Sequence, residues 1–379
     1  MDTIQRPLKQ IINKYLTNNK VIILLGSRRV GKTILIKSIE NDFEGNKLHL
    51  NGDDIDTHVI LKERTVANYK RLLQNVALLI IDEAQEIPEI GKILKLIVDE
   101  IKPIKIIVTG SSAFDLLNNT GEPLTGRSYS FMLYPIAQLE LMPNENILNT
   151  RQNLDERLIY GSYPELFHLN TLAEKENYLK SLVQSYLLKD ILAIDNAVRN
   201  TAKFNDLLKL LAYQIGKEVS YDELGKQLGM SKNTVEKYLD LLSKVFIIYK
   251  VSGFSRNLRK EIVKTTRWFF MDNGIRNAII SNFNLPALRL DMGELWENYL
   301  MAERIKRNTY KELSIQKYFW RTYDQQEIDL IETQQDTIHA FEFKYGDNKI
   351  IKVPSGFKHA YPNANFTVIN RDNYLDFIA

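Results

Sequence analysis

The sequence predicts an α/β protein of two or three domains, and three observations lead to this fold class. The chain has 379 residues, whereas a single domain usually takes about 150. Short apolar runs rich in β-branched residues alternate with segments of helical spacing through the N-terminal part of the chain. These runs are apolar on both faces, which is typical of parallel strands that helices cover on both sides.

The first predicted element is a strand at Val21–Leu25, which a glycine loop and a helix at Thr33–Glu40 follow. Two more buried strands are predicted at Val76–Ile81 and Ile104–Val108, because both runs are apolar and β-branched. The segment Ile90–Ile101 between them has apolar residues at helical spacing. This alternation predicts a parallel sheet in an α/β domain.

Helical spacing dominates the middle of the chain, and strand patterns return toward its end. The segment 144–198 is mostly helical with a break at Gly161 and Pro164, and shorter helical pieces follow over 204–242. A further helix is predicted at Gly293–Ile305. The remaining predicted strands are Phe246–Val251, Arg267–Met271, Lys317–Tyr323, Ile328–Ile331, Ile338–Tyr345 and Phe366–Ile369.

Composition excludes several classes of protein. Lys and Arg number 50 and Asp and Glu 47, so the net charge is +3; the chain is not basic over its whole surface, although a local basic patch is compatible with this total. The absence of cysteine excludes disulfides, thiolate zinc sites and cysteine nucleophiles. The five histidines include no His-x-x-x-His pair, which excludes a zinc-protease helix.

The apolar runs of the sequence are too short to span a membrane. The longest have strand length, whereas a membrane span needs about 20 residues. Residues 1–20 mix charged and amide side chains and lack the apolar region of a signal peptide. We therefore expect a cytoplasmic protein.

The first chemical motif lies between the first predicted strand and the helix after it. Eight residues fit the pattern G-x-x-x-x-G-K-[ST] in the strand–loop–helix context that it requires. Such a loop turns backbone N–H groups toward phosphates, and the helix N-terminus adds partial positive charge. Lys32 would reach the β- and γ-phosphates of ATP, and Thr33 would ligate Mg²⁺. The loop consists of Gly26, Ser27, Arg28, Arg29, Val30, Gly31, Lys32 and Thr33.

A pair of carboxylates supports the first motif. The apolar run Leu78–Ile81 ends in Asp82 and Glu83. The first would hold Mg²⁺ through water, and the second would polarise the attacking water. Solvated carboxylates often end strands, so the pair alone is a weak signal. Downstream of a phosphate loop it indicates ATP hydrolysis.

The strand Ile104–Val108 ends in Thr109–Ser112, and here the sequence resembles the AAA+ class of ATPases. The resemblance implies a polar residue at this strand end that senses the γ-phosphate. Ser111 is the first candidate and Thr109 the second, and a Gly-Ser turn without this role is the alternative. Arg127 follows a short segment later; it would either complete the site of a neighbouring copy as an arginine finger, in a homo-oligomer, or bond its own domain.

The order of motifs resembles one family, the bacterial and archaeal ATPases that join an AAA-type N-terminal domain to a C-terminal domain of uncharacterised function. That C-terminal domain is itself similar to restriction-endonuclease-like folds of the PD-(D/E)XK type. The resemblance spans nearly the whole chain. It rests on Gly26–Thr33, Ile80–Gln85, Thr109–Ser112, Leu124–Arg127, Tyr160–Glu165, Phe269–Gly274, Glu294–Asn298, Trp320–Thr322 and Glu342–Lys344.

Four domains are expected from the motifs and the resemblance together. They are a P-loop ATPase core at 1–142, a helical lid or connector at 143–203, a winged helix-turn-helix at 204–275 and a nuclease-like α/β domain at 276–379. The family name constrains the fold more than the function, because one fold can support many activities.

A helix-turn-helix pattern occurs in the third of these segments. A short helix and glycine turn over Ser220–Ser231 precede a second helix at Lys232–Ser243, with Ser231 as its N-cap. Polar residues at the start of the second helix would face a DNA groove. These residues are Lys232, Asn233, Thr234 and Lys237.

The two strands after this pattern would form a wing with a basic tract between them. The tract has five cations against Glu261, a local charge of +4, which favours contact with DNA phosphates. The alternative is that the same fold binds a protein partner. The tract consists of Arg256, Arg259, Lys260, Lys264 and Arg267.

A second candidate site lies near the end of the chain. Period two places Glu342 and Lys344 on one strand face, and a hairpin would bring Asp329 beside them. These carboxylates would hold Mg²⁺ or Mn²⁺ while Lys344 orients or deprotonates water. Glu297 would add a ligand from a helix, with Glu327 as an alternative ligand. A charged, exposed strand face without metal is the competing interpretation.

Two functions remain open from the sequence. The first is an ATP-hydrolysing, DNA-associated AAA-type protein whose nuclease-like C-terminal domain cleaves DNA. The second is a nucleotide-dependent switch whose C-terminal regions bind a protein partner and do not cleave DNA. A small-molecule kinase fits less well, because a compact kinase needs neither the Asp-Glu pair nor the long appended domains.

Overall fold

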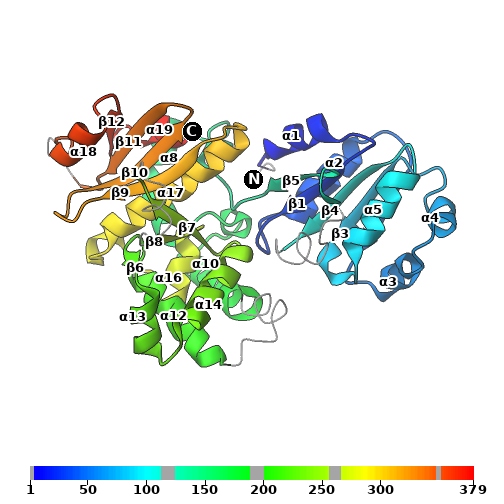
Figure 1. Cartoon of the computed structure of the whole chain (residues 1–379), viewed down its shortest axis with the longest axis horizontal. Coiled ribbons are helices and arrows are strands. Elements are labelled where there is room, and N and C mark those ends of the chain that lie inside the picture. The colour runs from blue at the N-terminus through cyan, green and yellow to red at the C-terminus, as the bar shows by residue number, and fades with distance from the viewer. Residues whose placement is uncertain (1–3, 112–123, 188–199, 256–265, 347–350) are drawn as a thin grey trace. The chain divides into compact units, whose positions relative to one another are not determined.

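A computed structural model describes residues 4–111, 124–187, 200–255, 266–346 and 351–379. The chain forms two compact units, each with its own sheet. The first unit comprises residues 1–134, 186–196 and 244–246, and the second comprises residues 135–185, 197–243 and 247–379. Figure 1 colours the chain from blue at the N-terminus to red at the C-terminus.

The sheet of the first unit is parallel throughout and has the strand order β2-β3-β4-β1-β5. Its three central strands are those that the sequence predicts, so the expected parallel sheet is confirmed. The two outer strands carry mixed polar and apolar residues and have no comparable apolar run. The strands are β1 (Val21–Leu25), β2 (Lys47–Asn51), β3 (Leu78–Asp82), β4 (Lys105–Gly110) and β5 (Ser128–Met132).

Helices pack against this sheet and bury its central strands. The apolar face of α5 joins one buried core with alternate strand residues, so that Ile93 and Ile97 share a core with Ile23 and Leu79. This helix confirms the pattern predicted over Ile90–Ile101. The helical segments of the unit are α1 (Leu8–Tyr15), α2 (Lys32–Asp42), α3 (Ile55–Lys62), α4 (Val66–Leu72), the 3₁₀ turn η1 (Ala84–Glu86) and α5 (Ile90–Glu100).

The second unit contains a mixed sheet with the strand order β12-β11-β10-β9-β7-β8-β6. Strands β9, β10 and β11 are antiparallel neighbours, and β12 runs parallel to β11. Strand β7 pairs in parallel with β9 and so joins a small antiparallel sheet to the C-terminal strands. The strands are β6 (Glu218–Val219), β7 (Ile248–Gly253), β8 (Thr266–Phe270), β9 (Gln316–Arg321), β10 (Glu327–Gln334), β11 (Thr337–Phe343) and β12 (Asn365–Ile369).

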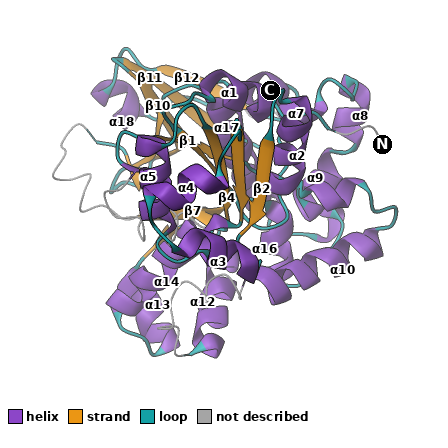
Figure 2. Ribbon diagram, turned by 90° about the vertical axis from the view of Figure 1, so that its right-hand side faces the viewer, coloured by secondary structure: helices purple, strands orange, loops and turns teal. Residues whose placement is uncertain are grey.

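The long helix α17 (Met292–Tyr310) supplies much of the core of the second unit. Its Trp296 and Leu300 share a buried core with Phe319, Leu330 and Phe341 of the sheet. Figure 2 shows the helices in purple and the strands in orange. The other helical segments are α7 (Gln138–Leu141), α8 (Ile147–Gln152), α9 (Leu154–Tyr160), η3 (Pro164–Phe167), α10 (Leu172–Leu182), the π-helical turn η4 (Val183–Leu187), α12 (Thr201–Tyr213), α13 (Tyr221–Leu228), α14 (Lys232–Lys244), α16 (Asn273–Ile279), η5 (Pro286–Leu288), α18 (Ser355–Ala360) and α19 (Tyr374–Ile378).

Membrane-spanning helices are not found in the part of the chain that the structure describes, because no helix there combines the needed length with an apolar composition.

Candidate functional site

The glycine loop joins the end of β1 to the start of α2. Gly31 has φ 95°, a left-handed conformation that favours glycine. A side chain at Gly26 would place its Cβ 2.3 Å from the carbonyl oxygen of Leu133, so only glycine fits there. Both fixed glycines of the motif are therefore required by the backbone, and the loop leads into the N-terminus of a helix as predicted.

The Lys32 side chain is held against the loop itself. Its Nζ donates hydrogen bonds to the carbonyl oxygens of Gly26 at 2.9 Å and Ser27 at 3.3 Å. The residue is 5% exposed. A buried ammonium beside backbone N–H groups at a helix N-terminus is an arrangement suited to binding phosphate.

The Asp82 carboxylate lies between two hydroxyl groups, one from the first turn of α2 and one from the end of β4. Thr33 Oγ1 donates to Asp82 Oδ2 at 2.7 Å, and Thr109 Oγ1 donates to Asp82 Oδ1. Thr109 Oγ1 also accepts from the backbone N–H of Glu83 at 3.0 Å. The structure thus brings the loop threonine, the strand-end aspartate and the end of β4 into one hydrogen-bond network.

Glu83 and Gln85 extend this network. Glu83 has φ 48° and ψ 43°, a left-handed conformation that ends β3 sharply. Gln85 Nε2 donates to Glu83 Oε2 at 2.6 Å. The sequence marks Gln85 only as the last residue of the resemblance segment Ile80–Gln85, and its contact with Glu83 depends on the turn that Glu83 makes. The contact gives the glutamate a fixed polar neighbour.

Of the two candidates for a γ-phosphate sensor, Thr109 is the one whose contact with Asp82 is seen. Ser111 follows the end of β4 and is buried, with 4% of its surface exposed. Ser112, the last residue of the segment, lies outside the described residues.

Arg127 lies at the end of the sheet opposite to the phosphate loop, where β1 begins. Its carbonyl oxygen accepts from the N–H of Val21 at 2.8 Å, at the start of β1 rather than at its end. Its guanidinium pairs with Asp99, with Nε 2.8 Å from Oδ1. A five-residue strand is about 16 Å long. Arg127 therefore bonds its own domain and does not meet the phosphate loop of its own chain.

Two helices, α13 and α14, lie in the segments where the sequence predicts them. Helices α13 and α14 flank a turn in which Gly229 is left-handed. Ser231 Oγ accepts from the N–H of Thr234 at 3.2 Å, as an N-cap does. Lys232, Asn233 and Lys237 are exposed, and Thr234 is half-buried.

The charge on these two helices is balanced. Four acidic and four basic residues give 4 − 4 = 0 over α13 and α14, and Lys232 Nζ lies 3.5 Å from Asp222 Oδ2. Arg256, Arg259, Lys260 and Lys264 lie outside the described residues. The basic character expected for a DNA-binding face thus depends on that tract rather than on the helices.

The acidic residues near the C-terminus do come together. We call Glu297, Glu327, Asp329 and Glu342 the carboxylate cluster. Asp329 Oδ2 accepts from the N–H of Phe343 at 2.7 Å, which fixes it beside the end of β11. Lys344 Nζ donates to Glu342 Oε1 at 2.7 Å, so the two residues share a face as predicted.

The electrostatics of the cluster show how closely the groups interact. Burial and the neighbouring Glu342 carboxylate raise the pKa of Asp329 to about 7. Burial, with Asp329 nearby, raises the pKa of Glu297 well above its usual range. Ionised carboxylates repel one another most strongly when little water separates them, and this repulsion raises their pKa values. The α17 residue Glu297 and the two strand residues therefore form one electrostatic unit.

Arg267 enters the same cluster from β8. Its Nη2 lies 2.9 Å from Glu327 Oε2, and its Nη1 lies 3.6 Å from Glu297 Oε1. Among the described residues, no three carboxylate or imidazole side chains form a group that could hold a metal ion. The expected metal ligands are thus close together, but their arrangement does not fit a metal centre as it stands.

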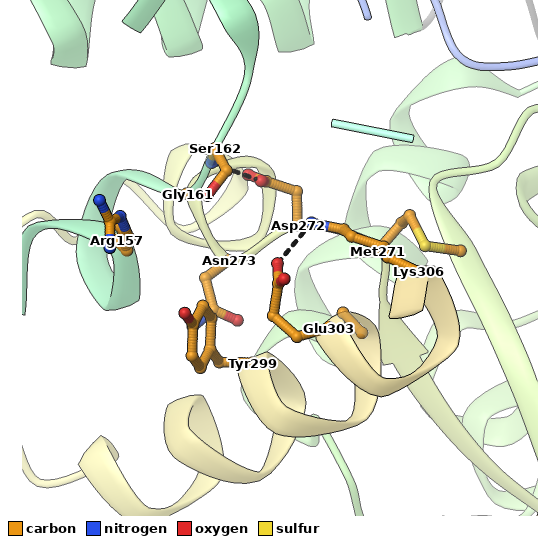
Figure 3. A pocket seen from close by; sticks show the side chains of 10 residues that line it. Arg157, Gly161, Ser162, Met271, Asp272, Asn273, Tyr299, Glu303 and Lys306 are labelled. Carbon is orange, nitrogen blue, oxygen red and sulfur yellow. Dashed lines mark hydrogen bonds and ion pairs between the residues drawn. The ribbon is translucent and has the colours of Figure 1, made fainter. Parts of the chain in front are cut away.

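Two motif segments of the second unit, Tyr160–Glu165 and Phe269–Gly274, meet helix α17 at a small pocket, shown in Figure 3. Asp272 caps α16 by accepting from Gly274 N–H at 2.8 Å, and it also accepts from Ser162 N–H at 2.8 Å. Glu303 and Lys306, both 2% exposed, form an ion pair at 2.7 Å. These contacts join segments that are far apart in the sequence. The motif residues of this pocket therefore have a structural role in holding the segments together.

Comparisons with protein families agree with the N-terminal site. Residues 18–142 match a family model described as an AAA domain. Residues 151–286 and 292–377 match two models described as domains of unknown function (DUF8612 and DUF4143). The chain therefore carries a P-loop AAA-type ATPase domain, followed by regions whose family gives no activity.

Curated relatives are uncharacterized proteins from bacteria and an archaeon. One from Mycobacterium tuberculosis is 22% identical over 329 residues, covering 86% of this chain and 70% of the relative. One from Haemophilus influenzae is 24% identical over 365 residues, covering 87% of this chain and 84% of the relative. One from Methanocaldococcus jannaschii is 26% identical over 331 residues, covering 77% of this chain and 69% of the relative.

Two solved structures illustrate what this chain is similar to. One is a signal transduction ATPase with numerous domains, with a tetratricopeptide repeat sensor, from Pyrococcus horikoshii, at 12% identity and a TM-score of 0.32. The match covers 80% of this chain but only 46% of that structure's chain. The other is a Thermotoga maritima RuvB mutant, at 16% identity and a TM-score of 0.32. The match covers 64% of this chain and 86% of that structure's chain.

Proposed function

We propose that this chain binds ATP with Mg²⁺ and hydrolyses it. The observation that carries the proposal is the Asp82 carboxylate, held by Thr33 and Thr109 beside the phosphate-binding loop. Hydroxyl and carboxylate oxygens are the ligands that Mg²⁺ prefers, and Thr33 and Asp82 already lie in contact. The AAA-domain match covers all three residues.

Each residue of the network has a distinct task in this proposal. Bound Mg²⁺ would supply positive charge against the β- and γ-phosphates. The Lys32 ammonium would exchange loop carbonyls for phosphate oxygens, and Glu83 would orient and polarise the attacking water. Thr109 bonds both Asp82 and the backbone of Glu83, so it would keep the two carboxylates in register.

A second copy of the chain would supply Arg127 as an arginine finger. The support for this is its position at the start of β1, away from the phosphate loop of its own chain. Its partner Asp99 is 36% exposed, so the ion pair is weak enough to be exchanged for a phosphate.

The test is ATP binding and hydrolysis with matched variants. Lys32→Ala should lose binding, whereas Glu83→Gln should bind ATP but lose turnover by at least about a hundredfold. Lys37→Ala, an exposed position on the same helix, is the control and should behave as wild type. Hydrolysis that survives both site variants would refute the proposal.

We further propose that residues 204–275 form a winged helix that contacts DNA. The order α12–β6–α13–α14–β7–β8 supports the fold, and the basic tract in the sequence supports the ligand. DNA affinity should fall steeply with salt, and charge reversal at Arg256, Arg259 and Lys260 should lower it and flatten its salt dependence. Unchanged binding would instead favour a nucleotide-dependent switch with a protein partner.

Cleavage of DNA by the C-terminal part is a further candidate function. The order α17–β9–β10–β11–α18–β12 supports a nuclease-like fold, as do the Glu342–Lys344 ion pair and the nearby position of Asp329, which bonds the N–H of Phe343. A cleavage assay with Mg²⁺ or Mn²⁺ tests it on branched, single-stranded and duplex DNA. Glu342→Ala and Lys344→Ala should each abolish cleavage while sparing ATP hydrolysis. Cleavage that survives both changes would remove the assignment.

A further inference from the structure

Arg267 is a buried cation whose position the nuclease-like pattern does not require. It lies in β8 and is 5% exposed. Its guanidinium carbon lies 4.5 Å from the centre of the Phe319 ring, and both of its terminal nitrogens face carboxylates. A buried arginine is stable only when acceptors compensate for its lost hydration. Here those acceptors belong to the carboxylate cluster.

The cluster contains buried oxygens that the described part of the chain does not satisfy. Glu297 Oε1 and Glu342 Oε2 are buried atoms without a hydrogen-bond partner among the described residues. Glu342 is 9% exposed, so this unsatisfied oxygen lies where water reaches it poorly. Two buried carboxylate oxygens therefore remain available to a bound cation.

The guanidinium lies beside the oxygen that such a cation would need. Arg267 Nη1 is 3.6 Å from Glu297 Oε1, the same atom that has no hydrogen bond. A divalent cation bound to Glu297 and Glu342 would be repelled by this positive charge at close range. Arg267 and a metal ion therefore compete for the same carboxylate.

We propose that Arg267 is a built-in counter-ion that occupies the cation position of the carboxylate cluster and keeps a latent divalent-cation site closed. The site would consist of Glu297, Asp329 and Glu342, and it opens when the guanidinium leaves Glu297. The inference deepens the candidate DNA-cleavage function. It is tested without DNA, so it can fail while that function stands.

The experiment measures Mn²⁺ binding to the full chain by electron paramagnetic resonance and calorimetry. The ATP site is silenced with Lys32→Ala and Asp82→Asn in every variant. On this background, Arg267→Gln should bind one Mn²⁺ at least about tenfold more tightly than the protein with Arg267 intact. Adding Glu342→Gln should remove that gain.

Controls separate a lost counter-ion from a general change of charge or fold. Arg321→Gln removes an arginine of the same sheet that pairs with Glu218 at 3.0 Å, and it should leave Mn²⁺ affinity unchanged. Arg267→Met preserves the apolar contact with Phe319 and should behave like Arg267→Gln. Circular dichroism of each variant checks that the fold is kept.

The result that overturns the proposal is visible even if the Arg267 variants do not fold. The protein with Arg267 intact should show no Mn²⁺ site in the cluster tighter than about 0.1 mM. A tighter site there that depends on Glu342 would show that Arg267 does not exclude the cation. Equal or weaker Mn²⁺ binding in folded Arg267→Gln would overturn it as well.

Discussion

Replacing Thr109 with valine removes one hydroxyl from the centre of the ATP site and keeps the shape of the side chain. The hydroxyl donates to Asp82 Oδ1 and accepts from the N–H of Glu83 at 3.0 Å. Thr109 is 0% exposed, so a water molecule does not easily take the place of the lost hydroxyl. The substitution leaves one carboxylate oxygen and one backbone N–H without their partner.

The magnitude follows from these two lost bonds. A buried polar group left unsatisfied costs about 1–3 kcal/mol, so Thr109→Val should lower the free energy of unfolding by about 2–4 kcal/mol. Asp82 retains its bond from Thr33, which limits the loss. Catalysis should suffer as well: about 3 kcal/mol of lost positioning corresponds to a fall in kcat of about a hundredfold.

The assay is steady-state ATP hydrolysis beside urea unfolding. Thr109→Ser retains the hydroxyl and should keep kcat within about tenfold of wild type. Ser111→Ala changes the neighbouring strand-end hydroxyl and distinguishes the two candidate sensors. A Thr109→Val protein that folds and keeps wild-type kcat would refute the reasoning, and a greater loss in Ser111→Ala would assign the sensor to Ser111.

Three further changes test the second unit. Lys306→Met leaves the Glu303 carboxylate buried without its ion pair, and it should lower the free energy of unfolding by about 3–5 kcal/mol in urea titrations. Gly161→Ala would place a Cβ 1.9 Å from a carboxylate oxygen at φ 73°, and it should cost more than about 3 kcal/mol in the same assay. Asp329 has a pKa of about 7 in the folded protein and near 4 when unfolded, so the folded state holds the proton more tightly. Stability should therefore fall between pH 4 and pH 7, by up to about 1.4 kcal/mol per pH unit, and Asp329→Asn should flatten this slope when EDTA is present.

Matched controls make these results specific. Lys180→Met breaks a helix pair with Glu176 in which both side chains are over a third exposed, and it should change stability by less than about 0.5 kcal/mol. Gly293→Ala adds a Cβ with no atom within 4 Å, and it should be neutral or stabilising by up to about 1 kcal/mol. A loss in the Lys180 variant as large as that in Lys306→Met would contradict the argument from burial. Stability that rises with pH would contradict the assignment for Asp329.

The central strands and the phosphate loop could be predicted because their signals are local. Val21–Leu25 and Gly26–Thr33 are contiguous, and each residue type fits its own backbone requirement. Edge strands such as Lys47–Asn51 escaped prediction because one face meets solvent and their composition is mixed. The contact of Thr109 with Asp82 depends on the order of the strands, in which β4 lies beside β3, and neighbouring sequence does not encode that order.

The second unit shows the limit of a motif more sharply. Glu297, Asp329, Glu342 and Lys344 have the residue types and spacing of a metal-dependent site, and the fold brings them together. Arg267 precedes this set in the chain and was predicted as part of a DNA-gripping tract. Arg267 lies in β8, which pairs with β7, and the parallel pairing of β7 with β9 brings the Arg267 guanidinium to the carboxylates.

A complete ligand set in the sequence is therefore not equivalent to a metal centre. Whether carboxylates hold a cation depends on every charge that reaches them, including cations from strands outside the motif. Burial makes this dependence strong, since the Arg267 side chain is only 6% exposed and water screens its charge weakly. In the proposal made above, the position of the Arg267 guanidinium decides whether this cluster acts as a closed ion-pair network or as a site for a divalent cation.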